Sequence, residues 1–354
     1  MNTTSTRRYD TTLSAIRLLA TLMIVTLHIT QQIERIRPSI HILTDFLEIA
    51  LTFFFCITAQ IYAKRTVERP MRWFFHRYVE LIVPSLLLGI VVTMPAFFTG
   101  NISCRTAADS ILSSVGFQVF VKDSWKFIQL WFLTDILICY AMIPGLQKIR
   151  FDKMSNVRFL LAVVIPPIVL QVVFSGIKAF CAIPLPGANA LSRFYVAYAF
   201  FRRYDITSRP AKKIMRVLSI LCIPAVAVTA YVRYFWATDK TGAVASLAEL
   251  LFLYTTILLG YVVYYLLYVS IDRKAPRYGR ILKISDRLSL PIYLVHCHFI
   301  GYSTSFLWRC GNLFTGIVVA LALTAVTSVA LYYTSKPIRN FLNKPFAERS
   351  REDT

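Results

Sequence analysis

The stretch LSAIRLLATLMIVTLHITQ (residues 13–31) decides what kind of protein this is. It is apolar over a length that crosses a bilayer as a helix, which takes about 17–25 residues. It nevertheless contains Arg17 and His28. Ionisable side chains are costly inside a membrane and usually have a function there. This segment therefore predicts a membrane helix and marks two residues of a candidate site.

Apolar runs of this kind recur along the whole chain. Of its 354 residues, 56% are hydrophobic and only 16% are charged, whereas soluble domains have about 45–50% and about 25%. No loop is large enough for a second domain. We expect one all-α, polytopic membrane domain over residues 1–354, a bundle of about ten transmembrane helices. The predicted spans are residues 13–31, 43–63, 78–98, 127–145, 159–177, 188–201, 217–233, 244–270, 288–305 and 313–335.

The basic residues orient these spans. If both termini are cytoplasmic, 28 of the 39 Lys and Arg residues fall in cytoplasmic segments and 10 in outer loops, as the positive-inside rule expects. The sixth span, 188–201, is short and contains Arg193, but omitting it would reverse the bias to 14 inside and 24 outside. The protein has a net charge of +21, and its excess of cytoplasmic Lys and Arg residues then faces anionic lipid. We expect a multi-pass protein of the cell (plasma or inner) membrane that binds no nucleic acid.

Arg17 and His28 lie on one face of the first predicted helix. They are 11 residues apart, which is three turns plus about 20°, and they are separated by about 16.5 Å along the axis. Arg17 is near the cytoplasmic end and His28 is in the outer half. Alone, Arg17 could also extend its side chain to the cytoplasmic interface.

The second predicted span returns inward and brings two carboxylates to the depth of His28. These are Asp45 and Glu48. A carboxylate facing an imidazole can fix its tautomer and stabilise its protonated form. Glu48 is favoured for this role because its estimated depth is closer to that of His28. Further acidic residues in predicted spans are Glu80, Asp135 and Glu249.

The cysteines and the two neighbouring histidines predict no metal site. Cys56, Cys139, Cys222 and Cys297 lie in predicted spans, where a small apolar packing residue is the simplest interpretation. His296 and His298 are two residues apart, so on a helix they point about 200° from one another and cannot bind one metal ion. Outer-loop pairing among Cys104, Cys181 and Cys310 is left open.

Five segments, in the same order, resemble the acyltransferase 3 family of integral membrane acyltransferases. RLLATLMIVTLH (17–28) fits its R-x10-H pattern, and LTFFFCITAQ (51–60) is similar to its FF-x-x-SG segment. IQLWFLTDILICY (128–140) resembles its HLWFL motif, with Gln129 in place of the histidine and Trp131 matching. RFYVAYAFFRR (193–203) is similar to an aromatic helix of the family that ends in basic residues, and ISDRLSLPIYLVHCHFI (284–300) resembles the IYLxH segment and places His296 on its histidine.

The resemblance implies an acyl-CoA-dependent O-acyltransferase. Members transfer an acyl group, usually acetyl, from cytoplasmic acyl-CoA to hydroxyls of cell-envelope carbohydrates such as lipopolysaccharide, exopolysaccharide or lipid-linked glycans. His28 is expected to be the general base or, alternatively, an acyl carrier, with His296 in reserve. The expected site residues are catalytic His28, Glu48 and His296; donor-binding Arg17 and Arg77; and substrate-binding Trp131, Gln129, Asp135 and Asp45.

A membrane transporter or flippase for a glycan or small solute is the alternative class, because intramembrane charges also mark substrate pathways. No sequence repeat of the kind found in many transporters is detectable. A non-catalytic membrane scaffold is a third class, in which Arg17 and His28 would matter only for folding.

Overall fold

The computed structural model describes residues 10–34, 37–121, 126–181, 187–237, 242–271, 279–301 and 305–352. These ranges are helical and contain no β-strand. Helices suit a lipid environment because they satisfy every backbone hydrogen bond within one segment. The α-helices of the described part are α1 (Thr11–Glu34), α2 (His41–Leu47), α3 (Ile49–Ala63), α4 (Pro70–Phe98), α5 (Cys104–Leu112), α6 (Trp131–Leu146), α7 (Asn156–Cys181), α8 (Ala188–Arg203), α9 (Arg209–Tyr231), α10 (Ala243–Ile271), α11 (Gly279–Ile300) and α12 (Leu313–Glu352).

Over its described residues, each predicted span coincides with helical structure. The span 43–63 corresponds to α2 and α3, which meet at Glu48. In the described part, seven segments are long and apolar enough to cross a membrane. The remaining predicted spans are α6 and α8, with 16 residues each, and α11, which begins with several charged residues. The count of about ten is therefore approximate.

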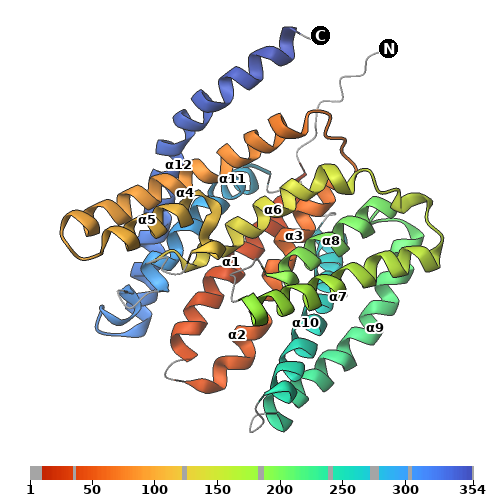
Figure 1. The fold of residues 1–354 in the computed structure, drawn as a ribbon. Coiled ribbons are helices and arrows are strands. Elements are labelled where there is room, and N and C mark those ends of the chain that lie inside the picture. Colours follow the sequence, from red (N-terminus) through yellow and green to blue (C-terminus); the bar gives the residue numbers. More distant parts are fainter. Residues whose placement is uncertain are drawn as a thin grey trace.

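The structure extends two of the predicted spans and adds a helix in a connecting segment. Helix α11 begins at Gly279, nine residues before the predicted span at 288, because its first turns are too polar to be recognised from hydropathy. Helix α12 continues to Glu352, well past 335, and extends beyond the rest of the bundle (Figure 1). The segment 99–126, which connects the third and fourth predicted spans, contains α5, which packs against α4.

The periphery of the bundle is apolar. Helices α7 and α9 leave most of their side chains exposed, and Figure 1 shows both at one side of the bundle. Such a surface is unsuited to water and suits lipid tails, which solvate apolar side chains. The exposed side chains on these two helices include Leu160, Leu161, Ile165, Ile168, Val172, Ile220, Leu221, Ile223 and Val228.

The core lies where α3 packs against α1, α8 and α10. Large aromatic side chains fill it, and Phe53, Phe194 and Tyr264 are each at most 1% exposed. Helices α3 and α10 approach closely at Gly260, where a Cβ atom would lie 2.8 Å from Cβ of Thr52. Only a glycine allows this approach.

Polar contacts join several loops at one end of the bundle. The side chain of Gln147 accepts a hydrogen bond from the Val67 amide (3.1 Å), and Arg203 donates to the Phe151 carbonyl (3.1 Å). Nζ of Lys64 donates to the Arg202 carbonyl (3.0 Å), and burial, together with the nearby Arg202 guanidinium, lowers the pKa of Lys64. These are the loops that the charge distribution assigns to the cytoplasm.

Gly260→Val tests the contact between α3 and α10. Forcing additional atoms into a packed core costs about 1–3 kcal/mol, so we expect a lower Tm of the purified protein in detergent. Gly176→Val on α7 is the control, because nothing lies within 4 Å of a Cβ atom there. Equal Tm values for the two variants would contradict the close packing at Gly260.

Candidate functional site

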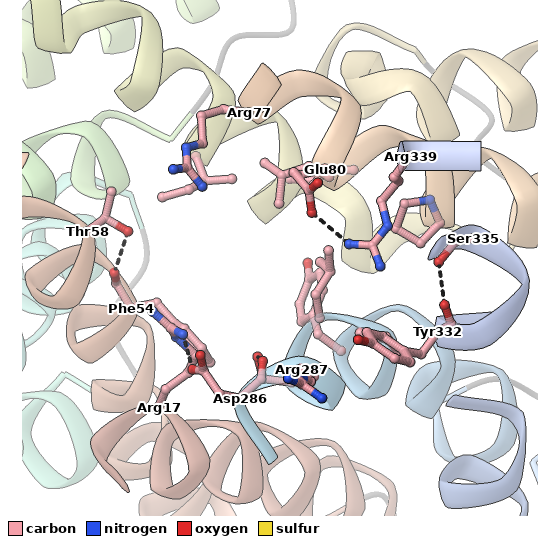
Figure 2. A pocket seen from close by; sticks show the side chains of 18 of the residues that line it. Arg17, Phe54, Thr58, Arg77, Glu80, Asp286, Arg287, Tyr332, Ser335 and Arg339 are labelled. Atoms are coloured by element: carbon pink, nitrogen blue, oxygen red, sulfur yellow. Dashed lines mark hydrogen bonds and ion pairs between the residues drawn. The ribbon is translucent and has the colours of Figure 1, made fainter. Parts of the chain in front are cut away.

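A cavity of about 530 Å³ lies between α1, α3, α4, α6, α11 and α12. Five cationic side chains line it, against two carboxylates. Figure 2 shows Arg17 with Asp286 and, across the cavity, Glu80 with Arg339. The cations that line the cavity are Arg17, Arg77, Arg287, Lys336 and Arg339.

Two of these cations are neutralised within the cavity. Arg17 forms an ion pair with Asp286 of α11, and Arg339 lies 2.7 Å from Glu80 of α4. Glu80 thus anchors α12 to α4.

Three cations of the cavity have no such partner. Arg77, Arg287 and Lys336 form no ion pair with a carboxylate of the described residues. The guanidinium of Arg77 instead lies 5.7 Å from the ring centre of Tyr62. The cavity therefore carries an excess positive charge that suits an anionic ligand.

The predicted shared face of Arg17 and His28 is confirmed, because both residues contact α11. Arg17 pairs with Asp286, and the ring centre of His28 lies 5.0 Å from that of His296. The contacts are 11 residues apart on α1 and 10 apart on α11, so these two helices run in the same direction. His28 is partly exposed but does not line the basic cavity.

His28 is oriented by its own helix. Its Nδ1 lies 2.7 Å from Oε1 of Gln31, an atom that only accepts, so Nδ1 carries the proton. The expected partner Glu48 does not make this contact. It lies instead with Asp45 in a second pocket, and Gln31, one turn beyond His28 on α1, supplies the acceptor.

His296 is fully buried and held by backbone groups. Its Nδ1 lies 3.0 Å from the Ile292 carbonyl and 2.7 Å from that of Tyr293, and its Nε2 lies 3.3 Å from Sγ of Cys297. Carbonyl oxygens only accept, so Nδ1 is protonated and Nε2 presents its lone pair.

Gln129 and Trp131 lie on the segment that packs against α11. The amide of Gln129 contacts the Leu294 carbonyl at 3.5 Å, and the hydroxyl of Tyr293 donates to the Gln129 carbonyl. The ring of Trp131 packs edge-on against Phe132. Gln129 thus helps to hold the part of α11 that carries His296.

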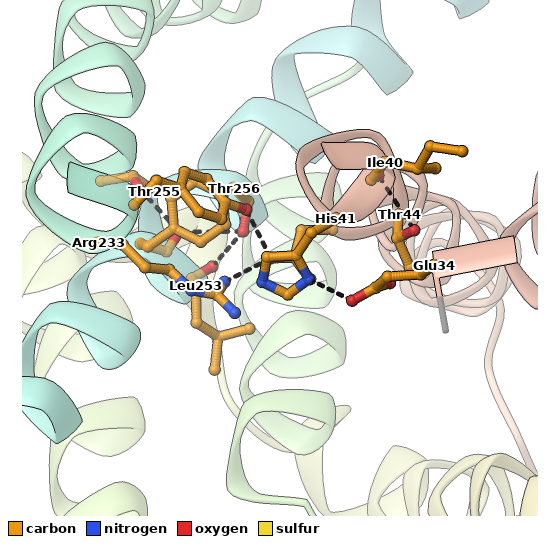
Figure 3. A network of polar contacts seen from close by, with 11 residues as sticks. Glu34, Ile40, His41, Thr44, Arg233, Leu253, Thr255 and Thr256 are labelled. Carbon is orange, nitrogen blue, oxygen red and sulfur yellow. Dashed lines mark hydrogen bonds and ion pairs between the residues drawn. The ribbon is translucent and has the colours of Figure 1, made fainter. Parts of the chain in front are cut away.

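A second pocket, of about 370 Å³, lies toward the other end of α1. Asp45 lines it and binds Arg233 (2.8 Å) and the Tyr234 hydroxyl (2.6 Å). His41 lies 2.6 Å from Glu34, and Figure 3 shows it between Glu34 and Arg233. The residues that line this pocket are Gln31, Glu34, His41, Thr44, Asp45 and Glu48.

Arg193 is a buried charge within the sixth predicted span. It lies in α8, as that span predicts, and is only 3% exposed. It interacts electrostatically with Glu48 and with the fully buried Asp135 of α6. In the sequence, the signal for this buried charge was a cation within an apolar run. Asp135 also lies close to Gly187, where a Cβ atom would be 3.4 Å from its Oδ2.

The comparisons with known proteins give one match. A family model described as an acyltransferase domain, Acyl_transf_3, matches residues 10–333, nearly the whole chain. No curated protein and no solved structure matches the chain.

Arg193→Met tests whether Arg193 balances Glu48 and Asp135. Removing one partner of a set of buried charges lowers the free energy of unfolding by about 3–5 kcal/mol, because the remaining charges stay unpaired. We expect a clear fall in Tm, and adding Glu48→Gln to Arg193→Met should recover part of it. Additive losses in that double variant, measured by thermal unfolding, would show that the two groups are independent.

Proposed function

Because the chain belongs to the acyltransferase 3 family, it is a membrane acyltransferase, and we propose that it transfers an acyl group, most simply acetyl, from acyl-CoA to a hydroxyl of a cell-envelope carbohydrate. The acceptor classes proposed are lipopolysaccharide, exopolysaccharide and lipid-linked glycan, and the proposed location is the plasma or inner membrane. The observation that carries this proposal is the basic cavity, with its three unpaired cations beside α1.

The donor is proposed to bind in the basic cavity. Coenzyme A carries several phosphate charges, and a guanidinium can contact phosphate with two parallel hydrogen bonds. Arg77, Arg287 and Lys336 supply the uncompensated charge, while Asp286 holds Arg17 in place. The cavity lies among segments that the positive-inside rule assigns to the cytoplasm, where acyl-CoA is made.

His28 is proposed as the general base. Its Nδ1 is occupied by Gln31, so Nε2 can accept a proton. As Nε2 takes the proton of the acceptor hydroxyl, the oxygen forms a bond to the thioester carbonyl carbon. The carbon–sulfur bond then breaks, and the leaving thiolate of CoA takes the proton back from His28. The acyl-carrier role for His28 is the alternative within this mechanism.

The acceptor is proposed to approach from the second pocket, which Gln31 connects to His28. Asp45 and Glu48 offer carboxylate oxygens that can accept hydrogen bonds from sugar hydroxyls. Glu48 is therefore proposed to act on the acceptor rather than on His28. Asp135 and Gln129 support this region through Arg193 and α11, respectively.

A transporter or flippase remains the alternative function. Purified protein distinguishes the two, since an acyltransferase releases free CoA in proportion to the acceptor modified. Transport without consumption of acyl-CoA would replace the proposal.

Arg77→Ala tests the donor site. Losing a hydrogen bond to a charged group costs about 1.5–3 kcal/mol, so we expect the KM for acyl-CoA to rise about 10- to 100-fold while that for the acceptor changes little. Arg158→Ala is the control, since Arg158 is exposed and outside the cavity. Parallel changes in both KM values would argue against a donor site here.

His28→Ala tests the base. A positioned general base contributes about 10²–10⁴-fold in rate, so acyl transfer should fall by this factor while the protein still inserts and purifies. Gln31→Leu keeps the imidazole but removes its hydrogen bond, and a neutral hydrogen bond is worth up to about tenfold. Near-normal turnover of His28→Ala would exclude His28 as the base.

A further inference from the structure

Three potential metal ligands from two helices meet beside the proposed base. They are His28 of α1 and the adjacent pair His296 and Cys297 of α11, and their ligand atoms all lie within 4.8 Å of one another. The two rings are 5.0 Å apart, and Sγ of Cys297 is 3.3 Å from Nε2 of His296. In a tetrahedral zinc site, with bonds of about 2.0–2.3 Å, neighbouring ligand atoms lie about 3.3–3.8 Å apart. Small side-chain rotations would therefore close this set around one ion.

The hydrogen bonds of both rings leave the correct nitrogen available. His296 gives its Nδ1 proton to backbone carbonyls, and His28 gives its Nδ1 proton to Gln31. Each Nε2 therefore presents its lone pair, in His296 toward the Cys297 thiol, and the acceptor at Nδ1 orients each ring. Metal-binding histidines nearly always show this arrangement, in which the other ring nitrogen donates to a fixed acceptor.

We propose that His28, His296 and Cys297 form a binding site for a soft divalent cation of the Zn²⁺ class. Two imidazoles and one thiol select Zn²⁺ or Cd²⁺ over Mg²⁺ and Ca²⁺, which prefer oxygen ligands. Binding exchanges the thiol proton of Cys297, which leaves to solvent, for a metal–sulfur bond. Three protein ligands leave the fourth position for water.

Burial determines how the ion enters and what it blocks. His296 is fully buried and Cys297 is 3% exposed, whereas His28 is partly exposed. The ion therefore reaches the site past His28. Its bond to Nε2 uses the lone pair that would accept the proton of the acceptor hydroxyl, so a bound ion inhibits acyl transfer. This last consequence rests on the proposed function; the binding site itself does not.

Cobalt binding tests the site without any acyl transfer. Co²⁺ takes zinc sites, and a cobalt–thiolate bond gives a charge-transfer absorption band in the near ultraviolet. We expect the metal-free, full-length protein in detergent to develop this band at one equivalent of Co²⁺ and Zn²⁺ to abolish it. Cys297→Ser should remove the band, and His28→Gln should weaken Co²⁺ binding at least tenfold.

The matched control is Cys222→Ser, which removes a thiol of similar burial on α9, at 2% exposed, and should leave the band unchanged. A band that persists in Cys297→Ser, or no band in the native protein, would overturn the metal site. His28→Gln decides the matter if Cys297→Ser does not fold, because unchanged affinity in that variant contradicts the site as well.

Measurements of acyl transfer distinguish an inhibitory ion from an ion that catalysis requires. We expect micromolar Zn²⁺ to inhibit the native enzyme reversibly and Cys297→Ser at least tenfold less. Loss of activity on stripping the metal would instead identify the ion as a catalytic requirement and overturn the inhibitory role. If the protein shows no acyl transfer at all, the proposed function fails while the cobalt titration still decides the metal site.

Discussion

The parallel contact between α1 and α11 is the interaction on which the proposed chemistry depends. At one end Arg17 pairs with Asp286, and about three turns further on His28 meets His296. An unpaired charge within the bundle would be costly in lipid. The ion pair between Arg17 and Asp286 therefore also fixes the position of α1 along the axis of α11. That register brings the two histidines together.

The two pockets beside α1 have opposite electrical character. The cavity at the Arg17 end has more cations than carboxylates, whereas Glu34, Asp45 and Glu48 line the other pocket. The first suits a polyphosphate donor, and the second suits neutral hydroxyl groups better than anions. His28 lies between these environments on the same helix and is connected to the second pocket through Gln31. Donor and acceptor can therefore reach the reacting region from opposite ends.

Buried polar groups outside α1 organise the rest of the bundle. Arg193 of α8 interacts electrostatically with Glu48 and Asp135, and Gln129 contacts the backbone of α11. Electrostatic attraction thus favours α8 near α6 and the junction of α2 and α3, and a hydrogen bond joins the Gln129 segment to α11. Apolar packing alone gives weaker positional specificity, because hydrophobic contact has no preferred direction.

The sequence by itself determined the all-helical fold, the positions of the spans and the shared face of Arg17 and His28. These are local properties, since the rise of 1.5 Å and the turn of 100° per residue fix the relations within one helix. The contact of Gln31 with His28, three residues apart on α1, is local in the same sense. Only the tertiary structure decided that His296 contacts His28 while Glu48 faces the second pocket, that Arg193 is buried, and that Cys297 joins the two histidines. Contacts between helices depend on how far each helix is rotated about its axis and shifted along it. Side-chain packing over the whole bundle sets that rotation and shift, and no single segment encodes them.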